Sequence, residues 1–296
     1  MKVILAKSAG FCWGVKRAVD KARSLARENR GPVYTDGPLI HNQQMMEQLR
    51  AEGVIEVSDP QFIASNRTKS AKSEGVSDSA LRTRTKILLI RAHGIPPDRR
   101  AMLEKLPVTL VDVTCPDVAR IQGLIKKYSQ KGYHIIIFGD VGHAEVTGLL
   151  GHAGGSGHVV SRIQDIDSLP EIGPVCLVSQ STQFPSSYAK IIKAVRQYFP
   201  DVEVLDTICE STKNRQKELI EIAETVDAIV VVGGAHSANT IRLVELAKTL
   251  KPVSHIQTSD QLKPEQFCNF RTVGLTAGSS TPSFIIEDVK KTLEKM

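Results

Sequence analysis

Three segments of this chain share one pattern, in which an apolar, strand-like stretch leads to a cysteine and an amphipathic helix follows. They are residues 3–11 before Cys12, residues 108–114 before Cys115 and residues 202–208 before Cys209. The cysteines are roughly 100 residues apart, close to the length of one small domain. A fold that repeats three times brings three thiols to one centre. Three thiolates there suit a metal cluster and leave one coordination position open.

The repeat extends beyond the cysteines. After each one, apolar residues recur at helical spacing, as at Val15, Val19 and Ala22. Two apolar strands then follow, and each leads into a polar loop; in the second loop a proline opens the next helix. The polar side chains that we single out at these strand ends are His41, His93, His143, Glu145, Ser181, Ser237, Asn239 and Ser280.

Buried strands that alternate with helices predict parallel sheets. We therefore predict an α/β fold of three similar small modules, in a pseudo-threefold, trefoil-like arrangement around a central cluster. The modules are expected at residues 13–113, 114–206, and 207–296 together with 1–12. Residues 64–85 are rich in Ser, Thr, Lys and Arg and predict a solvated surface insertion. Ligands are expected at the carboxyl ends of the strands.

Composition argues against several other classes of protein. Five cysteines without a C-x-x-C pair argue against a disulfide framework, a zinc ribbon and a thioredoxin-like site. No apolar run approaches the roughly 18 residues of a membrane span, and the N-terminus lacks the features of a signal peptide. We therefore expect a cytoplasmic protein with no membrane partner. A net charge of +6 fits an anionic substrate or an acidic partner but is too diffuse to predict nucleic-acid binding.

Residue types at the repeated positions indicate their chemistry. A cysteine before a helix has its thiolate favoured by the helix dipole. A single cysteine is more often a small buried residue, which is how we interpret Cys176 and Cys268. The repeated imidazoles and hydroxyls suit a phosphate group. Glu145, a carboxylate among them, is either a proton donor of raised pKa or a surface residue that caps a helix.

These motifs resemble those of the LytB family, the 4-hydroxy-3-methylbut-2-enyl diphosphate reductases. Residues 10–18, GFCWGVKRA, are similar to its N-terminal signature. The motifs around His41, His93, Cys115, His143 and Cys209 agree in order and spacing. The resemblance covers essentially the whole chain apart from residues 64–85.

The resemblance implies a 4Fe–4S cluster held by Cys12, Cys115 and Cys209, with an open iron for the substrate's hydroxyl oxygen. It implies a diphosphate site made of residues on all three modules: His41, His93, His143, Ser237, Asn239 and Ser280. Glu145 is expected to supply protons through a network that includes Ser181.

The implied reaction is reductive dehydroxylation of (E)-4-hydroxy-3-methylbut-2-enyl diphosphate to isopentenyl diphosphate and dimethylallyl diphosphate. This is the last step of the non-mevalonate isoprenoid pathway. The implied electron donor is ferredoxin or flavodoxin. Three positions depart from the family pattern: Ser181 replaces a usual threonine, Ala238 a common second serine, and Arg91 a small residue.

Two other functions remain open on the residues alone. An open-iron hydro-lyase acting on a different phosphorylated alcohol would need no electrons, so product analysis with and without a reductant separates it from a reductase. A non-enzymatic iron–sulfur protein that senses a diphosphate would bind the ligand and never turn it over.

Overall fold

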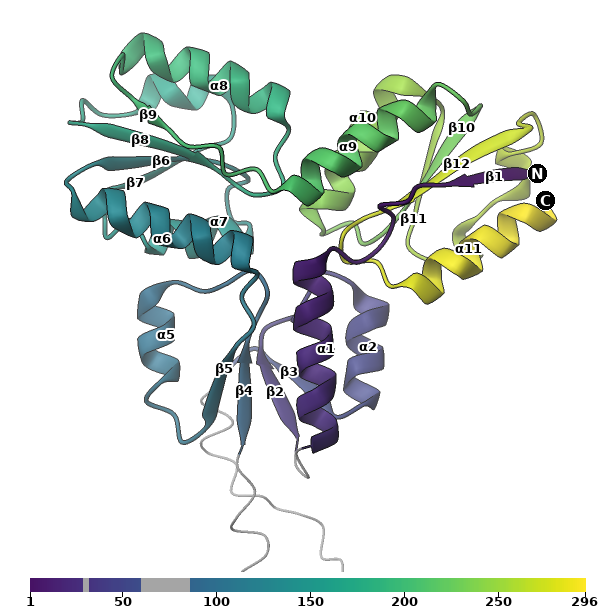
Figure 1. Ribbon diagram of the computed structural model, residues 1–296, viewed down its shortest axis with the longest axis horizontal. Helices are drawn as coiled ribbons and strands as arrows, with labels where there is room; N and C mark the ends of the chain where they lie inside the picture. The colour runs from purple at the N-terminus through teal and green to yellow at the C-terminus, as the bar shows by residue number, and fades with distance from the viewer. Residues whose placement is uncertain (29–31, 60–85) are drawn as a thin grey trace, which may run out of the picture.

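In a computed structural model, the chain forms three sheets of four parallel strands, with helices packed on them, around a common centre (Figure 1). The structure describes residues 1–28, 32–59 and 86–296. The predicted α/β fold of three similar modules is confirmed. The insertion expected at residues 64–85 lies outside the described residues.

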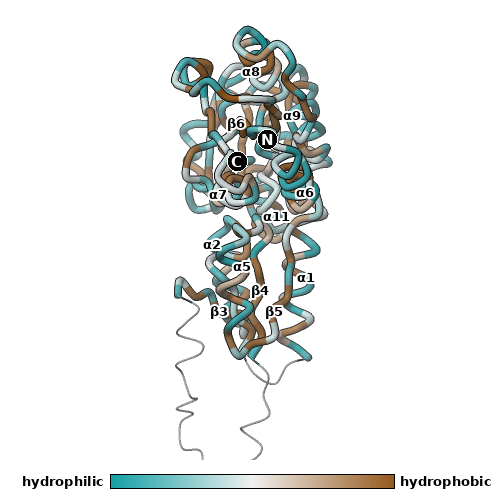
Figure 2. The backbone as a smooth tube through the Cα atoms, turned by 90° about the vertical axis from the view of Figure 1, so that its left-hand side faces the viewer, coloured by the Kyte–Doolittle hydropathy of each residue, from teal (hydrophilic) through white to brown (hydrophobic). Residues whose placement is uncertain are grey.

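The first sheet has the strand order β3-β2-β4-β5. Its strands are β2 (Val33–Asp36), β3 (Val54–Val57), β4 (Ile87–Ile90) and β5 (Thr109–Asp112). The helices beside it are α1 (Trp13–Glu28), α2 (Gln43–Ala51) and α5 (Pro97–Leu103). All four side chains of β4 are buried, which is typical of a parallel sheet covered on both faces. Figure 2 shows this hydrophobic strand between more hydrophilic helices.

The second sheet repeats this order as β7-β6-β8-β9. Its strands are β6 (His134–Phe138), β7 (Gly157–Val160), β8 (Val175–Ser179) and β9 (Glu203–Val204). Its helices are α6 (Pro116–Gln130), α7 (Ala144–Gly151), the 3₁₀ helix η1 (Ile163–Ser168) and α8 (Pro185–Tyr198). The apolar stripe of α6, Val118, Ile121 and Ile125, is buried, as its helical spacing predicts.

The third sheet has the order β1-β12-β10-β11. Its strands are β1 (Lys2–Leu5), β10 (Ala228–Val232), β11 (Val253–Ile256) and β12 (Thr272–Ala277). Its helices are α9 (Glu210–Ala223), α10 (Ala238–Leu250), the 3₁₀ helices η2 (Ser259–Gln261) and η3 (Pro264–Gln266), and α11 (Ser283–Lys295). Strand β1 pairs with β12 in parallel, so the N-terminus completes the sheet of the C-terminal module.

The strands before the cysteines are shorter than predicted. The segment 202–208 forms only the two-residue strand β9, and in the segment 3–11 only residues 3–5 belong to a strand, β1. Near Cys209 the ladder ends because a side chain takes its place: the hydroxyl of Thr207 accepts from the Ser179 N–H at 2.7 Å and donates to the Ser179 carbonyl at 2.8 Å.

Contacts between modules hold the three sheets around their centre. Arg242 of α10 forms an ion pair with Asp140, which follows β6. The Ser280 hydroxyl, which follows β12, donates to the His41 carbonyl at 3.0 Å. Arg17 of α1 donates to the Thr114 carbonyl at 3.1 Å. None of the helices in the described part of the chain is long and apolar enough to cross a membrane.

Candidate active site at the junction of the three modules

The three repeated cysteines lie where the chain leaves one sheet and enters the first helix of the next module. Cys115 and Cys209 are the N-cap residues of α6 and α9, and Cys12 directly precedes α1. The N-terminal ends of these three helices point to the centre of the molecule (Figure 1). Cys12 lies near enough to raise the pKa of both Cys115 and Cys209 by Coulomb repulsion. The structure therefore brings the three thiols into one region.

A glycine permits the close approach of α1 to Cys115. A Cβ atom added to Gly14 would lie 2.5 Å from the Cys115 sulfur and 3.3 Å from its Cβ. No side chain fits at position 14 while the thiol keeps this orientation. Gly14 is thus a residue of the site that the sequence interpretation did not single out.

Burial decides the protonation state of two of these thiols. It raises the pKa of Cys115 to about 11, although the backbone N–H groups of Asp117 and Val118 lower it. Burial also raises the pKa of Cys209, against a contact of 3.1 Å with the Thr212 hydroxyl. Without a metal, Cys115 and Cys209 are therefore protonated thiols at neutral pH, although the helix N-termini favour the thiolate. A metal would have to displace these protons.

The thiol centre fits a cluster better than a single metal ion. In the described residues, no group of three or more His, Cys, Asp or Glu side chains is arranged to hold one ion. A single ion needs each sulfur within about 2.3 Å of the same point. A cluster places each thiolate on a different iron, so its ligands stand further apart. The three cysteines that meet in this region are free and partly buried, and their thiols are the soft ligands that iron–sulfur clusters bind.

A buried arginine lies beside the thiols. Arg215 of α9 is 4% exposed. Its guanidinium lies near enough to Cys12 and Cys209 to interact electrostatically with both. Burial lowers the pKa of Arg215, whereas the two thiols raise it. A buried cation near the sulfur atoms favours an anionic group there, and a cluster with three thiolates would be such a group.

Three imidazoles meet in a second group at the same centre. The ring centroids of His41 and His93 are 4.3 Å apart, and His143 is 5.7 Å from the first and 5.9 Å from the second. His41 Nε2 and His93 Nδ1 are buried and have no hydrogen-bond partner in the described parts of the chain. Unpartnered buried polar atoms of this kind are completed by a ligand or by water. The predicted convergence of the three histidines is therefore observed.

The imidazoles are neutral without a ligand. Burial lowers the pKa of His41 to about 4 and lowers that of His93 well below the usual value. Burial also lowers the pKa of His143, helped by Arg242 and opposed by Asp140. His143 Nδ1 accepts the Glu145 N–H at 3.2 Å, so the neutral ring carries its proton on Nε2 and can donate it to a ligand.

Hydroxyl and amide side chains continue this polar group on the third module. Ser237, Asn239 and Ser280 are all buried. The Ser237 hydroxyl caps α10 by accepting the Thr240 N–H at 3.4 Å, and the Ser280 hydroxyl lies 3.4 Å from it. Asn239 Oδ1 accepts the Ser279 N–H at 3.0 Å. The first turn of α10, with that of α2 beside His41 and that of α7 at His143, adds helix N-termini that favour an anion.

Glu145 and Ser181 form a buried pair on the second module. Glu145 is 3% exposed, and its carboxyl accepts the Ser181 N–H at 2.7 Å and the Ser181 hydroxyl at 2.8 Å. Burial raises the pKa of Glu145, although both hydrogen bonds lower it. Glu145 is near enough to Cys209 to raise the pKa of that thiol. The carboxyl is therefore a buried acid next to the thiol centre, not a surface helix cap.

Arg91 is a second residue whose role the sequence did not indicate. In the sequence it stands out only as a departure from a family pattern, yet it lowers the pKa of all three imidazoles by Coulomb repulsion. Asp36 is the main group that favours its charge, and a Cβ on Gly37 would lie 3.2 Å from its guanidinium. Arg91 therefore adds positive charge near the imidazoles.

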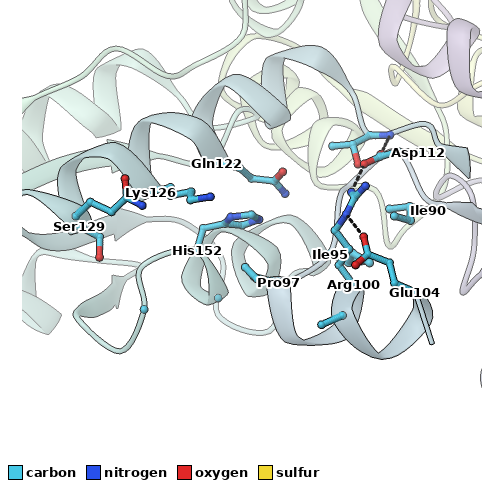
Figure 3. A pocket seen from close by; sticks show the side chains of 15 residues that line it. Ile90, Ile95, Pro97, Arg100, Glu104, Asp112, Gln122, Lys126, Ser129 and His152 are labelled. Carbon is cyan, nitrogen blue, oxygen red and sulfur yellow. Dashed lines mark hydrogen bonds and ion pairs between the residues drawn. The ribbon is translucent and has the colours of Figure 1, made fainter. Parts of the chain in front are cut away.

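A cavity of about 500 Å³ lies apart from this centre, between α5 of the first module and α6 of the second. Figure 3 shows Gln122, Lys126 and His152 at one end and Arg100 with its ion-pair partners at the other. None of the predicted site residues lines it. It is therefore not part of the candidate site.

The fold and the site together define a class: a three-module α/β protein in which three thiols meet beside a pocket for an anion. The family model described as "LytB protein" matches residues 3–294. The chain belongs to this family, and the resemblance found in its motifs is confirmed.

Relatives over the full length carry one name. A 4-hydroxy-3-methylbut-2-enyl diphosphate reductase of Opitutus terrae is 47% identical over 298 residues and covers 100% of both chains. The protein of the same name from Alkaliphilus oremlandii is 37% identical and covers 98% of each. Among solved structures, the E-1-hydroxy-2-methyl-but-2-enyl-4-diphosphate reductase of Plasmodium falciparum has a TM-score of 0.87 at 27% identity, covering 99% of this chain and 87% of that one.

Proposed function

We propose that this protein reductively dehydroxylates (E)-4-hydroxy-3-methylbut-2-enyl diphosphate to isopentenyl and dimethylallyl diphosphate. One observation carries the proposal: in a chain of the LytB family, three thiols, three imidazoles and a buried carboxyl come together between the modules. Relatives and solved neighbours named for this reductase match the whole chain. A further solved neighbour, 34% identical with a TM-score of 0.68, is described as the terminal enzyme of the non-mevalonate pathway.

Cys12, Cys115 and Cys209 are the residues that would hold a 4Fe–4S cluster. When bound, the cluster supplies electrons and a Lewis-acidic iron for the oxygen of the leaving hydroxyl. The chain contributes a partly buried setting for it and the buried cation of Arg215. The raised pKa values of Cys115 and Cys209 mean that loading the cluster releases protons.

The substrate's diphosphate fits the polar group formed by His41, His93, His143, Ser237, Asn239 and Ser280. Neutral imidazoles can donate N–H groups to it, and Arg91 and the N-termini of α2, α7 and α10 favour its negative charge. Binding energy from this remote group holds the hydroxyl end of the substrate in position for reaction. Ala238 offers no side-chain hydroxyl, so at that position only the backbone can contribute.

Glu145 is the proton donor of this proposal. Its raised pKa keeps a proton on the carboxyl nearer to neutral pH, and Ser181 lies 2.8 Å from one carboxyl oxygen. Removal of the hydroxyl as water uses two electrons and two protons; one proton joins the leaving oxygen and the other joins the hydrocarbon product. A general acid in this place contributes about 10²- to 10⁴-fold in rate. We further propose that electrons come from ferredoxin or flavodoxin and that the protein works in the cytoplasm.

The test is product analysis on protein reconstituted anaerobically with iron and sulfide. With a strong reductant, the wild type should release isopentenyl and dimethylallyl diphosphate, and without one it should release neither. Glu145→Gln should keep the cluster and lower turnover by about 10²- to 10⁴-fold. Glu47→Gln, which changes an exposed carboxyl of α2, is the control.

Two results would contradict the proposal. Turnover without any reductant would favour a hydro-lyase. Tight binding of the diphosphate with no turnover, in protein that holds a full cluster and receives electrons, would favour a sensor.

A further inference from the structure

The guanidinium of Arg215 joins two of the thiol-bearing segments. Its Nη2 donates to the carbonyl of Gly10, two residues before Cys12. Its Nη1 donates to the Ser211 hydroxyl at 2.6 Å, two residues after Cys209. One buried side chain therefore fixes the loop that carries Cys12 against the start of α9.

Among the described residues, no carboxylate lies at ion-pair distance from this cation. Within the part of the chain that the structure describes, its hydrogen bonds go to neutral oxygens, and Nε is buried without a partner. Cys12 and Cys209 favour the charged form of Arg215 more strongly than Glu218 does. By contrast, the guanidinium of Arg242 pairs with Asp140 and that of Arg23 with Glu52.

A buried charge without a counter-charge is costly, so the fold keeps one where an anion completes it. Arginine stays cationic in proteins. The two thiols nearest to Arg215 in electrostatic terms become thiolates when they bind a cluster. A cluster with three thiolates is negatively charged and is the counter-charge that this guanidinium lacks.

We propose that Arg215 is a positioning residue whose charge makes the cluster easier to reduce. The proposal rests on the proposed function, since it requires a cluster on the three thiols. One electron added to this centre makes it more negative, and no bond is made or broken in the protein. A fixed positive charge nearby stabilises the reduced state more than the oxidised one. At an effective dielectric of about 20, a unit charge several Å away changes such an equilibrium constant by about tenfold or more.

The experiment is a redox titration with dithionite of the reconstituted protein, without substrate, followed by electron paramagnetic resonance. Arg215→Gln removes the charge but keeps a hydrogen-bond donor. We expect its equilibrium constant for one-electron reduction to fall about tenfold, a shift of about 59 mV to more negative potential. Arg215→Lys keeps the charge and should stay within about twofold of the wild type. Arg23→Gln, which changes a partly buried arginine in α1, should leave the reduction potential unchanged.

A second variant acts in the opposite direction and covers the case in which Arg215→Gln does not retain a cluster. Glu218 partly offsets the charge of Arg215, and its carboxylate accepts the Lys7 and Ser8 N–H groups at 2.6 and 2.9 Å. Glu218→Gln should therefore move the potential to more positive values.

The inference is overturned if Arg215→Gln holds a full cluster at an unchanged potential. It is also overturned if the reduction potential of Arg215→Lys shifts as far as that of Arg215→Gln. Where Arg215→Gln holds no cluster, an unchanged reduction potential in Glu218→Gln overturns it. Each of these results leaves the proposed function intact when the wild type turns over. A wild type that binds no cluster would instead remove the proposed function, and this inference with it.

Discussion

Replacing Ser181 with alanine tests the assignment of Glu145 as the acid. The hydroxyl of Ser181 donates to the Glu145 carboxyl at 2.8 Å, and both residues are buried, at 6% and 3% exposed. This hydrogen bond stabilises the charged carboxylate and lowers its pKa. A hydrogen bond to a charged group contributes about 1.5–3 kcal/mol. Its loss removes stabilisation from the charged form and should raise the pKa of Glu145 further.

The sign of the kinetic effect follows from the role of the acid. Turnover requires the protonated carboxyl, so the rate falls as pH rises through the pKa of Glu145. In Ser181→Ala this alkaline limb should move to higher pH, while the maximum rate falls because the hydroxyl no longer assists proton transfer. Steady-state turnover with a saturating reductant, measured from about pH 6 to about pH 10, tests both.

Ser181→Thr is the matched variant, because threonine keeps the hydroxyl. Its alkaline limb should coincide with that of the wild type. An unmoved limb in Ser181→Ala, in protein with a full cluster, would refute the idea that this carboxyl controls the pH dependence.

Two further predictions concern the thiols and the imidazoles. Gly14→Ala should leave the metal-free fold intact, because the Cys115 thiol can rotate away from the new Cβ. It should lower the amount of bound iron, because a sulfur that is a ligand cannot rotate. Gly123→Ala, where a Cβ meets nothing within 4 Å, is the control, and equal iron in both variants would contradict this prediction. Binding of inorganic diphosphate near neutral pH should take up protons, since His41 has a pKa of about 4 without ligand and an anion raises it. Calorimetry in buffers of different ionisation enthalpy measures this uptake, and His41→Asn should reduce it; unchanged uptake would rule His41 out as its source.

The fold was predictable because its signal is repeated. Alternating buried strands and helices indicate parallel sheets, and three cysteines at similar spacing indicate three copies. We expected the N-terminal strand to pack with the C-terminal module, because that module otherwise ends one element early; the structure pairs β1 with β12. Strand lengths were not predictable, because near Cys209 a side-chain hydroxyl of Thr207 replaces backbone pairing. The exact module boundaries stay a prediction.

The protonation states of the site residues were harder to predict from the sequence than their positions in the fold. A helix N-terminus can be predicted from a motif, and that alone favours a thiolate at Cys115 and Cys209. Burial depends on the packing of all three modules, and it outweighs the helix for both thiols. The same cause makes His41 and His93 neutral, a charge state that no motif in the sequence indicates.

The residues that the sequence did not reveal act across module boundaries. Gly14 is defined by Cys115, about 100 positions away, and Arg215 by the carbonyl of Gly10. Such partners share no local pattern, so a single sequence carries no signal for them. Arg91 was visible only as an unusual residue, and its effect on three imidazoles needs their positions in space.

One rule of parallel sheets accounts for the whole candidate site. Every predicted site residue follows the carboxyl end of a strand: the cysteines follow the edge strands β1, β5 and β9, and the polar residues follow the two inner strands of each sheet. Because each cysteine lies on the connection from one module to the next, no module by itself holds all three thiols. The imidazoles come from two modules, and Ser237, Asn239 and Ser280 come from the third. A ligand at this centre therefore contacts all three modules at once, so its binding must stabilise their mutual arrangement as well as the site.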